Sequence, residues 1–261
     1  MKISFEKYHG TGNDFILIDN RTAGFHFSAD QIAFLCHRHF GIGADGLILI
    51  QKKAHFDFEM IYFNSDGKHG SMCGNGGRCA VMFAHKLGMI EHAAKFSTGD
   101  GEHTALIKSD DVVKLSMADV KGIDKVNHDF ILNTGSPHYV KFVSDVNQID
   151  VVREGRLIRY NEHFRSKGIN VNFVSQKDGV VRMRTYERGV EDETFSCGTG
   201  TVAVAIATFL ENWESNQKQE YQIQALGGKL KVYFTPDVNN TFTEVALEGP
   251  ASFVFSGEIE I

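Results

Sequence analysis

Short runs in which apolar and polar residues alternate, or in which β-branched residues dominate, recur along the 261 residues of the chain. Such runs are typical of strands in a sheet that has a covered face. They predict strands at 14–19, 46–50, 58–63 and 112–117, and again at 138–143, 180–186, 228–234 and 243–247. Both halves of the chain are therefore expected to be rich in strands.

Three segments have a helical pattern instead. Segments 74–88 and 198–213 are apolar on nearly all sides, which is typical of a buried helix. Segment 28–39 is amphipathic, and Ser28 is its expected N-cap. A buried helix in each half, accompanied by many strands, indicates a sheet that curls around the helix.

The two halves also resemble each other in sequence. TGNDFILID (11–19) resembles TGSPHYVKFV (134–143), FNSDG (63–67) corresponds to YERG (186–189), and MCGNG (72–76) corresponds to SCGTG (196–200), at offsets of 123, 123 and 124 residues. GIGADGLILI (41–50) matches GINVNFVS (168–175) at an offset of 127. Four matches in the same order indicate a duplicated domain. We expect an α/β (α+β) fold of two pseudo-symmetric domains.

Composition narrows the classes of protein. The net charge of −6 gives no electrostatic reason to expect a nucleic acid or an anionic membrane as partner. No apolar run approaches the roughly 20 residues of a membrane helix, and the start, MKISFEKYHG, alternates like a strand and lacks the apolar stretch of a signal peptide. We therefore expect a cytoplasmic protein, whose 4 cysteines are free thiols.

Each predicted buried helix begins with the sequence Cys-Gly-x-Gly, at Cys73 and at Cys197. The first N–H groups of a helix have no partner within the helix and lie at its positive end, so they bind a carboxylate. The same field lowers the pKa of a thiol at that position. Each motif is thus expected to be both a cradle for an anion and a reactive thiol.

Two related thiols that face one cleft suit the inversion of a carbon centre, because one removes a proton as thiolate and the other delivers a proton to the opposite face. Each sulfur must approach the carbon to about 3–3.5 Å, which places the sulfurs roughly 7 Å apart. At that distance two thiolates repel each other by about 2.4 kcal/mol, or roughly 1.7 pKa units. The state with one thiolate and one thiol is therefore favoured.

Other interpretations of these motifs are weaker. Cys36 and Cys79 are expected to be small buried apolar residues, and a zinc site at Cys36, His37 and His39 lacks a second cluster with ligand spacing. GIGADG (41–46) and GTGTVA (198–203) match a nucleotide-binding pattern, but neither lies between a strand and a helix as that pattern requires. Covalent catalysis by a single Cys–His pair would leave the second cysteine unexplained.

A set of motifs along essentially the whole chain resembles the diaminopimelate epimerase family: HGTGNDF (9–15), GIGADG (41–46), FNSDG with MCGNGGRC (63–79), GSPH (135–138), INVNF (169–173) and ERGVEDETFSCGTGT (187–201). The resemblance implies interconversion of LL- and meso-2,6-diaminopimelate, in lysine and peptidoglycan synthesis, without pyridoxal phosphate or metal. It implies a homodimer of chains in which each domain has a β-barrel-like mixed sheet around its central helix. The last strand is expected to return to the first domain, giving domains of 1–117 plus 250–261 and of 118–249.

The resemblance also implies roles for individual residues. Cys73 and Cys197 match the two acid–base thiols, and His138 and Glu187 match positions that adjust those thiols. The positions that match substrate-binding residues are Asn13, Asn64, Gly74, Asn75, Asn170, Glu187, Arg188, Gly198 and Thr199. The guanidinium of Arg188 suits a distal carboxylate and the carboxylate of Glu187 suits an ammonium group.

The sequence departs from the family pattern at three positions. Gly46 stands where many members have Gln, Ser136 stands where they have Asn, and His69 stands where a Glu is common. Two alternatives to the epimerase stay open. A proline or hydroxyproline racemase-like enzyme shares the two-thiol design but needs no clamp for a distal carboxylate, and a non-catalytic amino-acid-binding relative would need no thiols.

Overall fold

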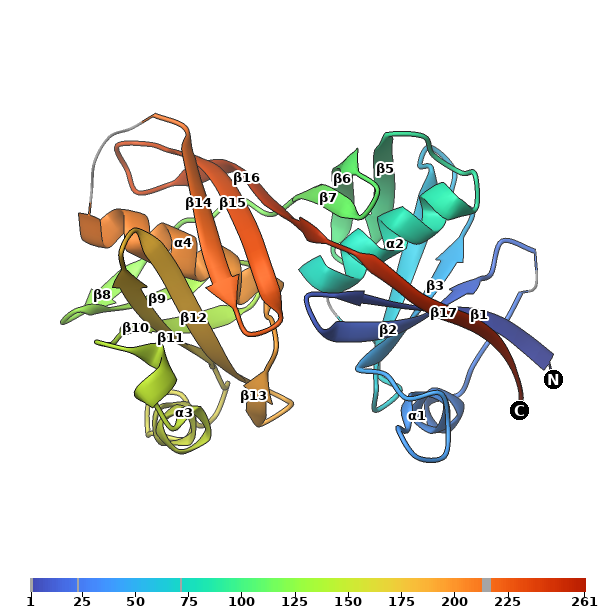
Figure 1. Cartoon of the computed structure of the whole chain (residues 1–261), viewed down its shortest axis with the longest axis horizontal. Coiled ribbons are helices and arrows are strands. Elements are labelled where there is room, and N and C mark those ends of the chain that lie inside the picture. Colours follow the sequence, from blue (N-terminus) through green and yellow to red (C-terminus); the bar gives the residue numbers. More distant parts are fainter. Residues whose placement is uncertain (1, 23, 71, 213–216) are drawn as a thin grey trace. The chain divides into compact units, whose positions relative to one another are not determined.

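The computed structural model describes residues 2–22, 24–70, 72–212 and 217–261. The chain forms two compact units, of which unit 1 comprises Met1–Leu115 and Gly249–Ile261 and unit 2 comprises Ser116–Glu248. Figure 1 follows the chain through them from blue to red. Each unit is described by itself below.

Unit 1 has strands on several sides of a long helix (Figure 1). The last strand of the chain lies antiparallel beside the first, with Glu260 opposite Lys2, as the family resemblance implies. The elements of unit 1 are β1 (Lys2–Gly10), β2 (Asn13–Asp19), α1 (Ala29–Cys36), β3 (Gly46–Gln51), β4 (Phe58–Asn64), α2 (Gly74–Lys86), β5 (Ala93–Thr98), β6 (Gly101–Ser109), β7 (Val112–Ser116) and β17 (Ser252–Glu260).

Unit 2 has a similar set of elements, with short additions. They are β8 (Asp124–Val126), β9 (Asp129–Asn133), β10 (Pro137–Phe142), the 3-10 helix η1 (Val146–Gln148), α3 (Val151–Arg159), β11 (Asn170–Lys177), β12 (Val180–Glu187), β13 (Asp192–Thr194), α4 (Gly198–Asn212), β14 (Gln219–Ala225), β15 (Gly228–Pro236) and β16 (Phe242–Pro250). The eight strands predicted from the sequence pattern all correspond to observed strands. Their ends differ by a few residues at most.

The pairing of the strands confirms the internal repeat. Unit 1 has six successive strand pairs, of which the second and fourth, β2–β3 and β4–β5, are parallel. The other four are antiparallel: β1–β2, β3–β4, β5–β6 and β6–β7. Unit 2 repeats this sequence of pairings, with the second and fourth pairs, β10–β11 and β12–β14, parallel. Its other four pairs are antiparallel: β9–β10, β11–β12, β14–β15 and β15–β16. Parallel neighbours need a crossover, and each unit has a helix in each of its two crossovers.

The register of the strands corrects one detail of the repeat. Phe15 lies opposite Gly46 in unit 1, and His138 lies opposite Asn170 in unit 2. Gly46 therefore corresponds to Asn170, at an offset of 124 residues, and the offset of 127 suggested by the glycines at 41 and 168 was wrong. The physical reason is that backbone pairing fixes the register of a strand, whereas loop glycines can recur by chance.

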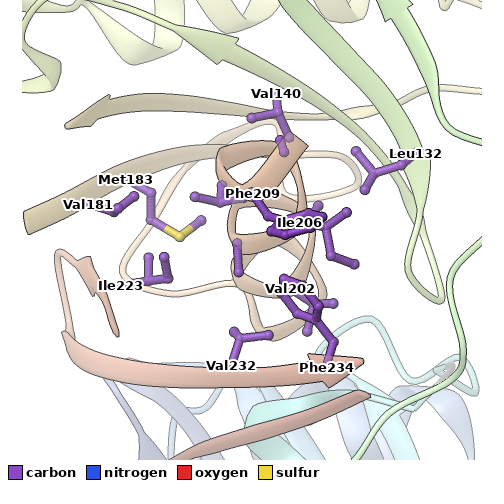
Figure 2. Packing of buried hydrophobic residues seen from close by; sticks show 14 of the residues in the cluster. Leu132, Val140, Val181, Met183, Val202, Ile206, Phe209, Ile223, Val232 and Phe234 are labelled. Carbon is purple, nitrogen blue, oxygen red and sulfur yellow. The ribbon is translucent and has the colours of Figure 1, made fainter. Parts of the chain in front are cut away.

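The two helices that begin at the cysteines are buried. All residues from Gly74 to Ala84 of α2 are buried, and so are most residues of α4. Close packing favours a glycine at position 76, because a Cβ there would lie 3.2 Å from the Ile48 side chain. Figure 2 shows Val202, Ile206 and Phe209 of α4 surrounded by side chains from the strands of unit 2. Burial of one such side chain contributes about 1.5–3 kcal/mol.

The predicted amphipathic helix is shorter than expected. It has Ser28 as N-cap, with a capping box to Gln31, but it ends at Cys36 and not at residue 39. Its last carbonyls are taken by the loop that follows, since Gly43 and Ile42 donate to Leu35 O at 3.0 and 2.9 Å. Helix α3 was not predicted. Among the described residues, no helix has the length and apolarity that crossing a bilayer requires.

Candidate functional site

Cys73 and Cys197 occupy equivalent places in their units. Cys73 is the N-cap of α2, and its carbonyl accepts the N–H of Gly77 at 2.7 Å. The carbonyl of Cys197 accepts the N–H of Thr201 at 2.8 Å, at the start of α4. Each thiol thus lies at the positive end of a buried helix, where a thiolate and a bound carboxylate are both stabilised.

In unit 1 the thiol of Cys73 faces the side chain of Asn13. Its Sγ donates to Asn13 Oδ1 at 3.6 Å, and Asn75 Nδ2 donates to the same oxygen at 3.1 Å. The other end of the Asn13 amide donates from Nδ2 to Asp45 Oδ2 at 2.7 Å. Since a carboxylate accepts but does not donate, Asp45 determines which end of the amide faces the sulfur.

A network of charges holds Asp45 in place. Arg38 binds Asp14 through two bonds of 3.0 and 2.8 Å and Asp45 through one of 2.7 Å, and Lys7 lies 2.7 Å from Asp14. Burial alone would raise the pKa of Asp14, but the hydrogen bonds and charges of Arg38 and Lys7 lower it to about 2. The sequence prediction missed this network, although Asp14 and Asp45 lie inside the quoted motifs.

In unit 2 the thiol of Cys197 faces a hydroxyl group. Its Sγ lies 3.5 Å from Thr199 Oγ1, which in turn lies 3.1 Å from Ser136 Oγ and 2.9 Å from His138 Nε2. A hydroxyl can donate to a thiolate or accept from a thiol. This partner can therefore serve Cys197 in either protonation state.

The neighbours of His138 fix its tautomer. The ring is fully buried, and burial first and the charge of Arg188 second lower its pKa to about 3, so it is neutral near pH 7. Asn172 Nδ2 donates to Tyr139 O at 3.2 Å and lies 3.1 Å from His138 Nδ1. Nδ1 is thus an acceptor, and the proton of the ring is on Nε2, which faces the hydroxyls of Ser136 and Thr199. Asn172 was not predicted from the sequence.

Three further predicted residues meet in unit 2 at the ends of β11 and β12. Asn170 Nδ2 donates to Ser136 Oγ at 3.1 Å, and its Oδ1 accepts the N–H of Arg188 at 2.9 Å. Glu187 accepts the hydroxyl of Thr194 at 2.8 Å, and the exposed Arg188 donates to Lys167 O at 3.1 Å. Unit 2 therefore brings Asn170, Glu187 and Arg188 into one neighbourhood.

The remaining predicted residues lie at the ends of elements. Asn64 is the exposed last residue of β4, and Gly74 and Asn75 form the buried first turn of α2. Gly198 and Thr199 form the first turn of α4. The four residues in these first turns are compatible with binding at helix N-termini, whereas Asn64 lies at the end of a strand.

The structure explains one of the departures from the family pattern, at Gly46, and shows the surroundings of another, at His69. A Cβ on Gly46 would lie 2.5 Å from the ring of Tyr62, and a Cβ on Gly70 would lie 2.3 Å from the same ring. The ring thus fills the space that a side chain at position 46 would need. His69 is exposed and its ring packs on Phe63 at 4.4 Å.

The surroundings of the other two thiols, Cys36 and Cys79, oppose their ionisation. Burial raises the pKa of both Cys36 and Cys79 to about 12. This confirms that they are small buried residues. The described parts of the chain contain no group of three His, Cys, Asp or Glu side chains that could hold a metal ion.

Comparison with known proteins decides between the remaining families. The chain matches the diaminopimelate epimerase family over residues 5–122 and 130–254. The chain belongs to the diaminopimelate epimerase family. It is 47% identical over 255 residues to the diaminopimelate epimerase of Flavobacterium psychrophilum, covering 97% of this chain and 98% of that protein. It is 41% identical over 261 residues to that of Chlorobaculum tepidum, covering 97% and 99%. Membership of this family makes the protein an isomerase of the epimerase type.

Solved structures show how widely the fold of diaminopimelate epimerases is shared. A PhzF-family phenazine biosynthesis protein of Bacillus anthracis has a TM-score of 0.79 at 13% identity, with 100% of each chain covered. A hydroxyproline epimerase of Agrobacterium vitis has a TM-score of 0.69 at 16% identity, covering 99% of this chain and 92% of that one. The fold therefore does not separate diaminopimelate epimerases from proline racemase-like enzymes, whereas the family match does.

Proposed function

We propose that this protein is a diaminopimelate epimerase that interconverts LL- and meso-2,6-diaminopimelate with two thiols and without a cofactor, as a step in lysine and peptidoglycan synthesis. The observation that carries the proposal is the equivalent placement of Cys73 and Cys197 at the starts of two buried helices. Membership of the family supports the same substrate.

The reaction divides between the two thiols. The thiolate of one cysteine removes the α-proton of the substrate, and the thiol of the other delivers its proton to the opposite face of the carbon. The C–H bond on one face is replaced by a C–H bond on the other, and the roles of the sulfurs are exchanged for the reverse reaction. N–H groups of Gly74, Asn75, Gly198 and Thr199 are suited to hold the α-carboxylate, because they lie in the first turns of α2 and α4.

The other side chains of the site orient the substrate in this proposal. Arg188 binds the distal carboxylate and Glu187 an ammonium group, while Asn13, Asn64 and Asn170 supply amide hydrogen bonds. His138 acts on Cys197 through Thr199, whose hydroxyl lies between them. Proline and hydroxyproline lack a second carboxylate at the distal end, so a racemase-like enzyme for them would have no use for Arg188 in this role.

Isotope labelling tests the reaction and its mechanism together. Purified protein is incubated with LL-diaminopimelate in D2O, the reaction is quenched below about a tenth of conversion, and the isomers are separated for mass spectrometry. We expect deuterium in the meso product and little in the remaining substrate, because a two-base enzyme delivers a solvent-derived proton from the second sulfur. Product that keeps its protium, or turnover of proline in place of diaminopimelate, would contradict the proposal.

We also propose that the protein is a cytoplasmic homodimer. The free state of all four cysteines is compatible with a reducing compartment. Phe253, Val254 and Phe255 of β17 are 44–49% exposed, an apolar surface that a second copy could cover. Sedimentation equilibrium of the wild-type protein and of Val254→Glu tests the dimer, and a monomeric wild-type protein at micromolar concentration would exclude it.

A further inference from the structure

Asn172, on β11, is a buried amide that is hydrogen-bonded at both ends. It is 0% exposed, and its Oδ1 accepts the hydroxyl of Thr185 on the neighbouring strand β12 at 3.0 Å. Its Nδ2 donates to Tyr139 O at 3.2 Å, which leaves the second hydrogen of the NH2 group for His138 Nδ1 at 3.1 Å. Because a backbone carbonyl only accepts, the amide cannot turn over without placing two acceptors against each other.

The same amide lies close to the start of α4. A Cβ added to Gly200 would lie 2.6 Å from Asn172 Oδ1 and 3.3 Å from Cys197 Sγ. The missing side chain of Gly200 therefore allows the amide to approach the first turn of the helix that follows Cys197.

Unit 1 has largely apolar residues at the equivalent places. The register of the strands relates three residues of unit 2 to three of unit 1: His138 to Phe15, Asn172 to Ile48 and Thr185 to Tyr62. Phe15 and Ile48 are fully buried, and the rings of Phe15 and Tyr62 pack edge to face at 5.9 Å. A Cβ on Gly76, the counterpart of Gly200, would meet the side chain of Ile48 and not an amide. The shared fold thus accepts apolar side chains at these places.

The polar set in unit 2 therefore has a reason other than packing. His138, Asn172 and Thr185 are 0–2% exposed, and removing polar groups from water costs free energy that their hydrogen bonds only offset. What such a set has, and an apolar set lacks, is direction, because each of its bonds has a donor and an acceptor.

The direction continues from the ring of His138 to two hydroxyls. With the ring proton on Nε2, His138 is a donor to the hydroxyls of Ser136 and Thr199, which both lie at 2.9 Å. Asn170 Nδ2 donates to Ser136 Oγ at 3.1 Å. The hydrogen of Ser136 itself is then directed to Thr199 Oγ1, at 3.1 Å, because the protonated Nε2 cannot accept it.

The hydroxyl of Thr199 is thereby directed to the sulfur. Among the contacts of the described residues, Cys197 Sγ at 3.5 Å is the acceptor left for the hydrogen of Thr199. Only this arrangement gives every hydrogen of the group an acceptor within it. With the proton on Nδ1, Nε2 would be an acceptor and would compete with the sulfur for that hydrogen. The tautomer of His138 therefore decides whether Thr199 donates to Cys197.

We propose that Asn172, supported by Thr185, is a positioning residue that holds His138 as the Nε2–H tautomer and so directs the hydroxyl of Thr199 toward the sulfur of Cys197. A hydrogen bond donated to a thiolate favours the ionised form, and this effect adds to that of the helix N-terminus. The charge that acts on the ring, that of Arg188, is present in every variant used below. The catalytic role of Cys197 rests on the proposed function, but the tautomer and the ionisation can be measured without turnover.

The first test is the protonation of the two ring nitrogens of His138. Protein with 15N-labelled histidine is studied at pH 8 by long-range 1H–15N correlation, in which protonated and unprotonated ring nitrogens give well-separated signals, and His138→Gln identifies the signals of this ring. In the wild type we expect Nε2 to be protonated and Nδ1 not. In Asn172→Asp, where an accepting oxygen replaces the NH2 group, we expect Nδ1 to be protonated. Asn147→Asp adds the same charge at an exposed position on η1 and should keep the wild-type pattern.

The second test is the pH midpoint for alkylation of Cys197 by iodoacetamide, measured by mass spectrometry of its peptide. Asn172→Asp is compared with the wild type, and the same change is then made in the Thr199→Val background. We expect the midpoint to rise by about one unit more where the threonine hydroxyl is present, because only there is a donated hydrogen bond lost. An equal rise in both backgrounds would mean that the added charge acts on the sulfur directly, and the route through Thr199 would be wrong.

The remaining outcomes also decide. A wild-type ring that is protonated on Nδ1 would overturn the proposal, and this spectrum does not depend on whether any variant at position 172 folds. A folded Asn172→Asp, judged by circular dichroism, whose Nδ1 stays unprotonated would overturn it as well. A protein that shows the expected tautomers and midpoints but does not epimerise diaminopimelate would refute the proposed function and leave the role of Asn172 intact.

Discussion

Asp45 accepts a hydrogen bond from the Asn13 amide at 2.7 Å, and this bond turns the oxygen of the amide toward the sulfur of Cys73. The relationship is a consequence of charge, since an ionised carboxylate can bind only the NH2 end of an amide. Asp45 thus orients the Asn13 side chain, which we propose to bind substrate, and with it the contact between Asn13 and the Cys73 thiol.

Replacing Asp45 by Asn should therefore lower kcat/KM by about tenfold, which corresponds to roughly 1.4 kcal/mol of transition-state stabilisation. An amide at position 45 can bind either end of Asn13, so the orientation of Asn13 is no longer fixed. Steady-state kinetics with diaminopimelate measure the change. Asp30→Asn, in the exposed first turn of α1, is the matched control, and equal activity of both variants would remove Asp45 from the site.

Thr199→Val removes the hydroxyl that faces Cys197 and keeps the shape of the side chain. We expect kcat/KM to fall about tenfold or more, because a hydrogen bond to a charged group is worth about 1.5–3 kcal/mol. The midpoint of Cys197 alkylation should move to higher pH while that of Cys73 stays. Thr208→Val removes a buried hydroxyl from the same helix, where it donates to Val204 O at 2.8 Å. A loss of activity in Thr208→Val as large as in Thr199→Val would show that the effect is structural.

Arg188→Met should lower kcat/KM for diaminopimelate about thirtyfold or more and leave the circular dichroism spectrum unchanged. A distal carboxylate that loses its guanidinium partner in a closed site costs about 2–5 kcal/mol, whereas the exposed side chain contributes little to folding. Arg153→Met, at a position on α3 where the side chain is 72% exposed, provides the comparison. A change of less than threefold for Arg188→Met would argue against a contact with the substrate.

His138 makes the stability of the protein depend on pH. Its pKa is about 3 in the folded protein and about 6.5 in the unfolded chain, so below pH 6.5 the unfolded chain takes up a proton that the folded protein does not. Stability is therefore lost as the pH falls from 6.5 toward 3. Between pH 7 and pH 5 we expect His138 to account for a loss of about 2 kcal/mol in the free energy of unfolding.

Urea unfolding at pH 7 and pH 5 measures this loss. In His138→Gln the part of the loss that comes from the ring should disappear, so the variant should be less sensitive to the change in pH than the wild type. In His128→Gln, where the side chain of His128 is 87% exposed, the loss should remain. Identical pH dependence in all three proteins would mean that His138 does not titrate as its burial requires.

The sequence by itself determined the features that depend on local patterns. The two buried helices, the Ser28 cap and the eight strands follow from periodicity and capping chemistry, which act over a few residues. The repeat was visible because duplicated motifs kept their spacing. The family could be recognised from motifs such as MCGNGGRC and SCGTG, which place the same Cys-Gly-x-Gly sequence at the start of each buried helix.

Only the tertiary structure decided how distant residues share contacts. Strand pairing set the offset of 124 between Gly46 and Asn170, which loop glycines had obscured. Asp45 reaches Asn13 from a position 32 residues away, and Arg78 reaches the carbonyl of Pro250 across 172 residues. Charge balance and hydrogen-bond direction depend on which groups a fold brings within about 3 Å. No pattern along the chain encodes that distance, so the orientation of Asn13 and the burial of Arg78 could be learned only from the folded chain.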